Sequence, residues 1–122
     1  MRKIIFLVVM FTMLCTPRTA KAETCIDFGE MRCTAYCPCE ECSSGYGRKC
    51  ALEGHYCKSE HTIAVDPDVI SLGSKVKIGD TVYIAEDTGG AIQNDHIDIF
   101  FDTHEEVEEF GVKYKQVEVI ID

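Results

Sequence analysis

Short apolar runs separated by turn residues follow one another from residue 61 onward, in a pattern that is typical of β-strands. These runs predict strands at His61–Val65, Lys75–Ile78, Thr81–Glu86, His96–Phe101 and Lys113–Ile121. A further strand-like stretch, Met31–Tyr36, precedes a segment rich in Cys, Gly and Ser. The turn residues between the second and third runs predict a tight hairpin. We therefore predict a mainly β protein, and short strands in this number favour a small closed barrel.

One helix is predicted between the last two strands. Thr103 stands at the N-cap position, Glu106 completes a capping box three residues later, and Gly111 marks the end of the helix. Val107 and Phe110 give this helix a narrow apolar face. Its run of acidic residues is explained by capping and solubility, so it indicates a solvated face rather than a site.

The first 22 residues have the pattern of a secretory signal. Arg2 and Lys3 precede an apolar run at residues 4–14, and a small-residue cleavage site ends at Ala22. The apolar run spans only about half of the hydrocarbon core of a bilayer, so an uncleaved membrane anchor is the second choice. We expect residues 1–22 to be removed, which leaves a secreted protein of 100 residues with no stable membrane insertion. That length is enough for one compact domain.

The exported part of the chain is strongly acidic. The predicted signal holds four of the twelve basic residues and none of the 21 acidic ones, so eight basic residues face 21 acidic residues after cleavage. This balance disfavours nucleic acids and anionic membranes as partners, because both repel a negative surface. A neutral, zwitterionic or cationic polymer is compatible with it.

Seven cysteines follow the signal, all in the N-terminal part of the exported chain: Cys25, Cys33, Cys37, Cys39, Cys42, Cys50 and Cys57. In a small exported domain this density predicts disulfides, and we expect most of these thiols to be oxidised. A metal site is the alternative, because Cys37-x-Cys39-x-x-Cys42 could join other ligands in a tetrahedral set. The nearby candidates for such a set are Cys50, Cys57, His55 and His61. The export signal favours disulfides, so we predict no metal and no cofactor.

Three of the apolar runs contain an aspartate or are followed by one: Asp66 and Asp87 come at the ends of their runs, and Asp98 stands within its run. Strand interiors normally exclude Asp, because an ionised carboxylate there loses hydration unless a partner or a cleft compensates. Ile97 and Ile99 surround Asp98 with apolar bulk, which favours a raised pKa for its carboxyl group. The three aspartates are therefore the candidate catalytic residues.

Each aspartate also has a structural alternative. Asp87 begins an Asp-Thr-Gly-Gly sequence, and Asp66 precedes Pro67, so both side chains could hold turns by accepting hydrogen bonds from nearby backbone. Asp98 could cap a turn or pair with a lysine. His96 shares its strand with Asp98, and because successive strand side chains point to opposite faces, we predict that it is not the catalytic partner.

The series AVDP, LGS, EDTGGAI and IDIFFD, preceded by CTAYCPCEEC, resembles the 3D (three-aspartate) domain family over residues 34–120. The resemblance implies a six-stranded double-psi β-barrel at residues 34–122, with residues 23–33 as a lead-in. Similar barrels form the catalytic domain of membrane-bound lytic transglycosylase A and occur in stationary-phase survival and resuscitation-factor-like proteins. It implies a monomer, located outside the cytoplasm at the cell wall, that cleaves the MurNAc–GlcNAc bond of peptidoglycan glycan strands.

The resemblance also implies roles for individual residues. Asp98 matches the single acid/base, Asp87 its acidic neighbour in the groove, and Asp66 the third member of the trio. The expected substrate-binding residues are Tyr36, Thr88, Gly89 and Gly90. The chain departs from the family pattern at residues 46–60, where a longer segment, here called the insert, borders the expected groove.

Two other functions fit parts of the sequence. A barrel of this fold could bind glycan strands without cutting them, as expansin-like relatives do, because shared fold and site residues do not guarantee turnover. Asp87-Thr88-Gly89 also spells the triplet of aspartic proteases. The protease pattern requires apolar residues before the triplet, whereas Ala85-Glu86 precedes it here, so this alternative is disfavoured.

Overall fold

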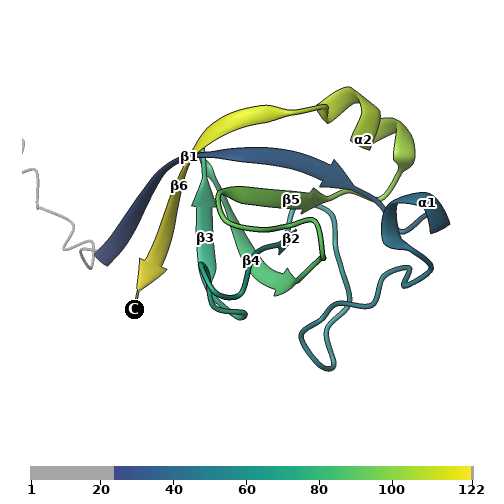
Figure 1. The fold of residues 1–122 in the computed structure, drawn as a ribbon, viewed down its shortest axis with the longest axis horizontal. Coiled ribbons are helices and arrows are strands. Elements are labelled where there is room, and N and C mark those ends of the chain that lie inside the picture. The colour runs from purple at the N-terminus through teal and green to yellow at the C-terminus, as the bar shows by residue number, and fades with distance from the viewer. Residues whose placement is uncertain (1–23, 122) are drawn as a thin grey trace, which may run out of the picture.

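Six strands form a closed barrel in the computed structural model, which describes residues 24–121 (Figure 1). The strands are β1 (Thr24–Tyr36), β2 (Thr62–Ala64), β3 (Lys75–Ile78), β4 (Thr81–Asp87), β5 (His96–Phe100) and β6 (Lys113–Ile121). Their order around the barrel is β1-β5-β2-β4-β3-β6, with β6 paired to β1. The predicted six-stranded barrel is confirmed. The predicted signal, residues 1–22, lies outside the described residues.

The barrel mixes parallel and antiparallel pairs. β1 runs parallel to β5, and β2 runs parallel to β4, whereas the other four neighbouring pairs are antiparallel. Parallel pairs need long connections, since the chain must return to the same end of the sheet. The chain from β1 to β5 passes through β2, β3 and β4, and the chain from β2 to β4 passes through β3. The cysteine-rich segment joins β1 to β2, which are not neighbours, and lies at one end of the barrel (Figure 1). This interleaved pairing agrees with the double-psi barrel that the resemblance implied.

The core follows the period of two that β-strands impose. On β5, Ile97 and Ile99 are fully buried inside the barrel, and Asp98 between them is only partly covered. The other strands contribute inward side chains in the same way, and together they form one cluster. Its buried members are Met31, Cys33, Ile63, Val65, Ile70, Val76, Ile78, Ala85, Ile97, Ile99 and Val117.

β1 is longer than the pattern predicted, because it begins at Thr24 rather than at Met31. Residues 24–33 pair with β6, so most of the segment that we assigned as a lead-in belongs to the barrel. The alternation is interrupted there by a register shift between Asp27 and Gly29, where Gly29 has a left-handed φ of 71°. A bulge of this kind inserts an extra residue into the strand, so the alternation of inward and outward side chains is broken and the sequence pattern does not predict this part of β1.

The predicted helix is confirmed as α2 (His104–Phe110), capped by Thr103 and ended by Gly111. Thr103 Oγ1 accepts a hydrogen bond from the backbone N–H of Glu106 at 3.2 Å. A second, four-residue helix, α1 (Glu40–Ser43), was not predicted. Its N-cap is Cys39, which is not among the residues that usually signal a helix start. Neither helix is long and apolar enough to cross a membrane.

Ile97→Ala should lower the free energy of unfolding by about 2–5 kcal/mol, because it leaves a cavity in the barrel core. Urea denaturation of both proteins measures the difference. Ile26→Ala is the matched control, since Ile26 is 47% exposed and its loss should cost less than about 1 kcal/mol. Equal losses in the two variants would contradict the assigned core.

Candidate active site

Two of the three predicted aspartates are brought together by the short strand β2. Ala64 on β2 pairs with Asp98 on β5 and, on its other side, with Asp87 on β4. Strands lie about 4.8 Å apart, so the two aspartates are about 10 Å apart at their Cα atoms, with a single methyl side chain between them. A register shift between Ile63 and Ala64 brings Asp87 rather than Glu86 opposite Ala64.

Both aspartates open into one groove of about 780 Å³. Its walls come from the ends of the strands, from the cysteine-rich segment and from the turn after β4. The lining includes six of the seven predicted site residues: Tyr36, Asp87, Thr88, Gly89, Gly90 and Asp98. The remaining lining residues are Cys42, Ser43, Ser44, Tyr46, Gly47, Lys49, Cys50, Ala51, Ala64 and Ile92.

Burial raises the pKa of the Asp98 carboxyl group to about 6. The negative charge of Asp87 raises this pKa further, whereas a hydrogen bond from the Thr34 hydroxyl lowers it. A carboxyl group with such a pKa is partly protonated near neutral pH. It can therefore both donate and accept a proton, as general acid–base catalysis requires.

A chain of hydrogen bonds runs behind Asp98. Thr34 Oγ1 donates to Asp98 Oδ1 at 2.9 Å and lies 2.6 Å from His96 Nε2. Arg32 lies 3.1 Å from the other ring nitrogen, Nδ1, and can only donate to it. Nδ1 also lies 3.2 Å from the carbonyl oxygen of Ala91, an acceptor. Because Thr34 donates its own proton to Asp98, we assign a proton to Nε2, which donates it to Thr34 Oγ1. Burial lowers the pKa of His96, which favours this neutral ring.

The prediction that His96 points away from Asp98 is wrong. The two residues are two positions apart on β5, and side chains two positions apart share a face of the strand. Thr34 sits opposite Asp98 in the parallel pairing of β1 with β5, so its hydroxyl bridges the two side chains. The period of two could have identified His96 from the sequence, whereas Thr34 required the strand register.

The carboxylate of Asp87 accepts hydrogen bonds from three neighbouring groups. Its Oδ1 accepts from the backbone N–H of Ala51 at 3.0 Å and of Thr88 at 2.9 Å. Its Oδ2 accepts from the Tyr36 hydroxyl at 2.8 Å. Burial and the nearby Asp87 raise the pKa of Tyr36, so its hydroxyl keeps the proton that it donates. Asp87 is thus a fixed negative charge in the groove wall.

Tyr36 is 8% exposed, and its ring packs edge-on against Phe100 at 5.2 Å between centroids. The ring is therefore buried within the protein, and the hydroxyl orients Asp87. Thr88, Gly89 and Gly90 form the groove wall after β4. At Gly89 a Cβ atom would lie 3.1 Å from the Ile92 side chain, so the turn passes close to this residue.

Asp66 is separate from the other two aspartates. It is not among the residues that line the groove, and its carboxylate accepts hydrogen bonds from the backbone of Asp68 at 3.0 Å and of Asn94 at 2.9 Å. These two bonds lower its pKa. The carboxylate joins the loop after β2 to the loop before β5, as the Asx-turn alternative described.

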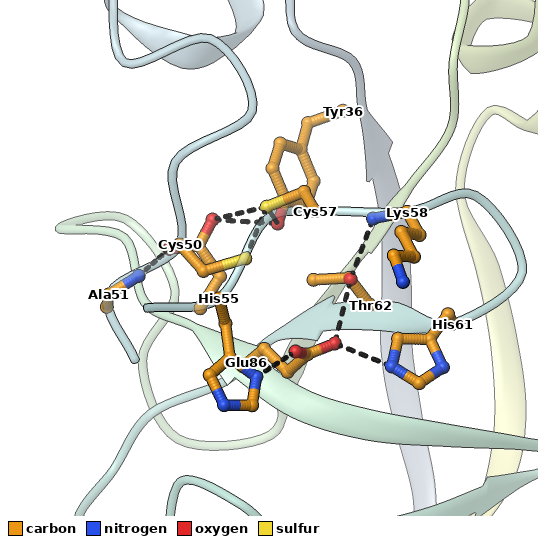
Figure 2. Close-up of polar contacts among 10 residues, drawn as sticks. Tyr36, Cys50, Ala51, His55, Cys57, Lys58, His61, Thr62 and Glu86 are labelled. Carbon is orange, nitrogen blue, oxygen red and sulfur yellow. Dashed lines mark hydrogen bonds and ion pairs between the residues drawn. The ribbon is translucent and has the colours of Figure 1, made fainter. Parts of the chain in front are cut away.

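The insert is attached to the barrel through Glu86, as Figure 2 shows. Glu86 is 3% exposed, and its two side-chain oxygens contact three neighbouring side chains. His55 Nδ1 lies 2.5 Å from Oε2, and His61 Nε2 and Thr62 Oγ1 each lie 3.0 Å from Oε1. A buried carboxylate with these partners is compensated for its lost hydration. The bond from Ala51 to Asp87 then extends the attachment into the groove.

No disulfide joins the cysteines in the described part of the chain, so the disulfide prediction is not met there. Cys33 faces the barrel core, which separates it from the others. Cys50 and Cys57 meet at 2.8 Å between sulfurs, longer than the roughly 2.05 Å of a disulfide bond. Cys57 Sγ lies 3.7 Å from Asp87 Oδ2, whereas Cys37, Cys39 and Cys42 gather around His104. The alternative metal set considered from the sequence is therefore divided between two places.

The chain is similar to a known protein family and to several named proteins. The family model of the 3D domain matches residues 61–121, half of the chain. The cell wall-binding protein YocH of Bacillus subtilis (strain 168) is 48% identical over 59 residues, which cover 48% of this chain and 21% of YocH. The putative cell wall shaping protein YabE of the same organism is 37% identical over 89 residues, covering 71% of this chain and 21% of YabE.

Among solved structures, MltA from E. coli superposes with a TM-score of 0.49 and 20% identity. The match covers 61% of this chain and 28% of MltA. The chain therefore corresponds to less than a third of each of these relatives.

The pKa of Asp98 predicts how stability depends on pH. Because the folded protein holds this proton up to about pH 6 and the unfolded chain only to about 3.8, stability falls as pH rises through that window. Asp98→Asn should remove this loss and raise the free energy of unfolding above pH 6 by up to about 3 kcal/mol. Urea denaturation at pH 4 and pH 7 measures it.

Asp80→Asn, in the exposed hairpin turn, is the control and should leave the pH dependence unchanged. A wild-type stability that does not fall between pH 4 and pH 6, with Asp98→Asn no different, would contradict the raised pKa.

Proposed function

Because the chain belongs to the 3D domain family, we propose that it cleaves peptidoglycan glycan strands in the manner of a lytic transglycosylase, with Asp98 as the acid/base. The observation that carries this proposal is the Asp98 carboxyl group, which opens into the groove with its pKa raised to about 6. We further propose that the protein acts outside the cytoplasm as a monomer, after removal of residues 1–22.

One carboxyl group is enough for this reaction. Asp98 first protonates the oxygen of the MurNAc–GlcNAc bond, and the bond to the anomeric carbon breaks. The C6 hydroxyl of the same MurNAc then bonds to that carbon and returns its proton to Asp98, which closes a 1,6-anhydro ring. No water is consumed, and the acid is regenerated in its starting form.

Asp87 supports this chemistry through its charge. Its carboxylate, held by Tyr36, Ala51 and Thr88, raises the pKa of Asp98 and faces the positive charge that develops on the sugar. Hydrolysis by two carboxyl groups would require one of them to activate a water or attack the sugar. Asp87 already accepts three hydrogen bonds at 3.0 Å or less, which suits a fixed charge better than a mobile base.

The hydrogen-bond chain behind Asp98 gives Thr34 a positioning role. Its hydroxyl fixes the rotamer of the carboxyl group through Oδ1 and leaves Oδ2 free of any protein hydrogen bond among the described residues. Oδ2 is then the oxygen that carries the proton to the substrate. His96 holds the Thr34 hydroxyl in the orientation that donates to Asp98.

A glycan-binding module is the second candidate. The names of YocH and YabE refer to binding and shaping the cell wall and not to its cleavage. The groove would serve a bound glycan strand equally well, since its lining combines the carboxylates with the Thr88-Gly89-Gly90 turn. Product analysis distinguishes the two functions, because a binding module retains peptidoglycan without releasing fragments.

The protein should release 1,6-anhydro-MurNAc products from purified peptidoglycan, and mass spectrometry of the soluble fraction detects them. Asp98→Asn should lower the rate by at least about 100-fold, a typical contribution of a general acid, with the fold intact. Asp87→Asn should retain more activity and shift the optimum to lower pH, because Asp98 then loses its proton more easily. Asp80→Asn is the matched control and should cleave at the wild-type rate.

Three outcomes would contradict the assigned roles. Products with reducing-end MurNAc alone would indicate a hydrolase. Binding to peptidoglycan without any soluble product, over several pH values, would favour the glycan-binding module. Full activity of Asp98→Asn together with an inactive Asp87→Asn would exchange the roles of the two aspartates.

A further inference from the structure

Three thiols and one imidazole meet at the end of the barrel where β1 finishes. Cys37, Cys39 and Cys42 surround Nδ1 of His104, with sulfur–nitrogen distances of 3.8, 3.6 and 3.4 Å. All four ligand atoms lie within 4.8 Å of one another. This cluster, here called the Cys3His cluster, is distinct from the groove carboxylates and takes no part in the proposed cleavage.

The distances match those of a tetrahedral metal centre. Zinc binds cysteine sulfur at about 2.3 Å and histidine nitrogen at about 2.05 Å, so tetrahedral angles separate the sulfur and nitrogen atoms by about 3.6 Å. The three observed distances fall within about 0.2 Å of that value. Hydrogen bonding alone does not require three sulfurs to approach one ring nitrogen, because Nδ1 can carry or accept only one proton.

The surroundings of His104 also suit a metal ligand. Its other ring nitrogen, Nε2, lies 3.3 Å from Oε1 of Glu108, one helical turn further along α2. Ligating histidines commonly donate this second N–H to a carboxylate, which fixes the tautomer and orients the ring. The Glu108 contact thus leaves Nδ1 free to face the three sulfurs.

We propose that Cys37, Cys39, Cys42 and His104 bind one Zn²⁺ ion as a structural site. Three thiolates and one imidazole are a usual ligand set of structural zinc, and a set of four leaves no open position for chemistry. The ion joins two segments that are far apart in sequence, because the cysteines follow β1 and His104 begins α2 (Figure 1).

The zinc ion would also fix one wall of the groove. Cys42 is a member of both the cluster and the groove lining, and the next residues, Ser43 and Ser44, line the groove as well. These residues form α1 and its C-cap, a helix of only four residues that has little stability by itself. A metal bond at Cys42 supplies the missing stability. The proposal does not depend on whether the groove cleaves or only binds glycan.

The full chain, purified in a thiol reductant without added chelator, should contain about one zinc per chain by elemental analysis. Replacement by Co²⁺ should produce intense thiolate-to-cobalt absorption in the near ultraviolet and the visible bands of a tetrahedral site. The cobalt spectrum tests the ligand set in the unaltered protein. A chelator should lower the melting temperature, because binding free energy contributes to folding, and added zinc should restore it.

Cys39→Ser and His104→Asn should each weaken zinc binding by at least about tenfold, measured by competition with a chromophoric chelator. Cys25→Ser is the matched control, since Cys25 is exposed near the start of β1 and should leave zinc affinity unchanged. Substoichiometric metal under reducing conditions, or a cobalt spectrum without thiolate bands, would overturn the proposal. A disulfide within the three cysteines of the zinc-supplemented protein would also overturn it.

Discussion

The pairing of β2 with strands on both of its sides is the constraint on which the site depends. Ala64 lies between Asp98 and Asp87 and holds their side chains in one groove with only a methyl group between them. β2 is only three residues long and fully buried, so its position is set by the barrel core rather than by its own strand propensity. A shift of one residue in this pairing would turn one carboxylate away from the groove.

The two groove aspartates differ because their surroundings differ. Asp98 is desolvated by the core and receives one hydrogen bond from the Thr34 hydroxyl, so its pKa rises. Asp87 receives hydrogen bonds from two backbone amides and a tyrosine, which fix it as an acceptor. Such a division between a proton donor and a fixed charge is the general means by which two carboxyl groups perform different tasks in one site.

The cysteine-rich connection contributes to the groove and is not merely a link between strands. Its insert is tied to β4 through Glu86 and Asp87, and its first turn meets α2 at His104. A loop of this length has few apolar side chains to bury, so polar contacts and the proposed metal bonds must offset the conformational entropy that it loses. The groove wall that it forms is therefore only as rigid as these contacts.

Local patterns in the sequence determined the strands from residue 61 onward, the caps of α2 and two aspartates of the groove, because alternation, capping boxes and buried charges involve neighbouring residues. They did not determine the start of β1, whose bulge interrupts the alternation, or α1, whose N-cap is an unusual residue. Only the tertiary structure placed Thr34 between His96 and Asp98, separated Asp66 from the groove and brought His104 to the three cysteines. These contacts join residues 28 to 67 positions apart. They depend on the register between strands and on where each connection crosses the barrel, which no local pattern encodes.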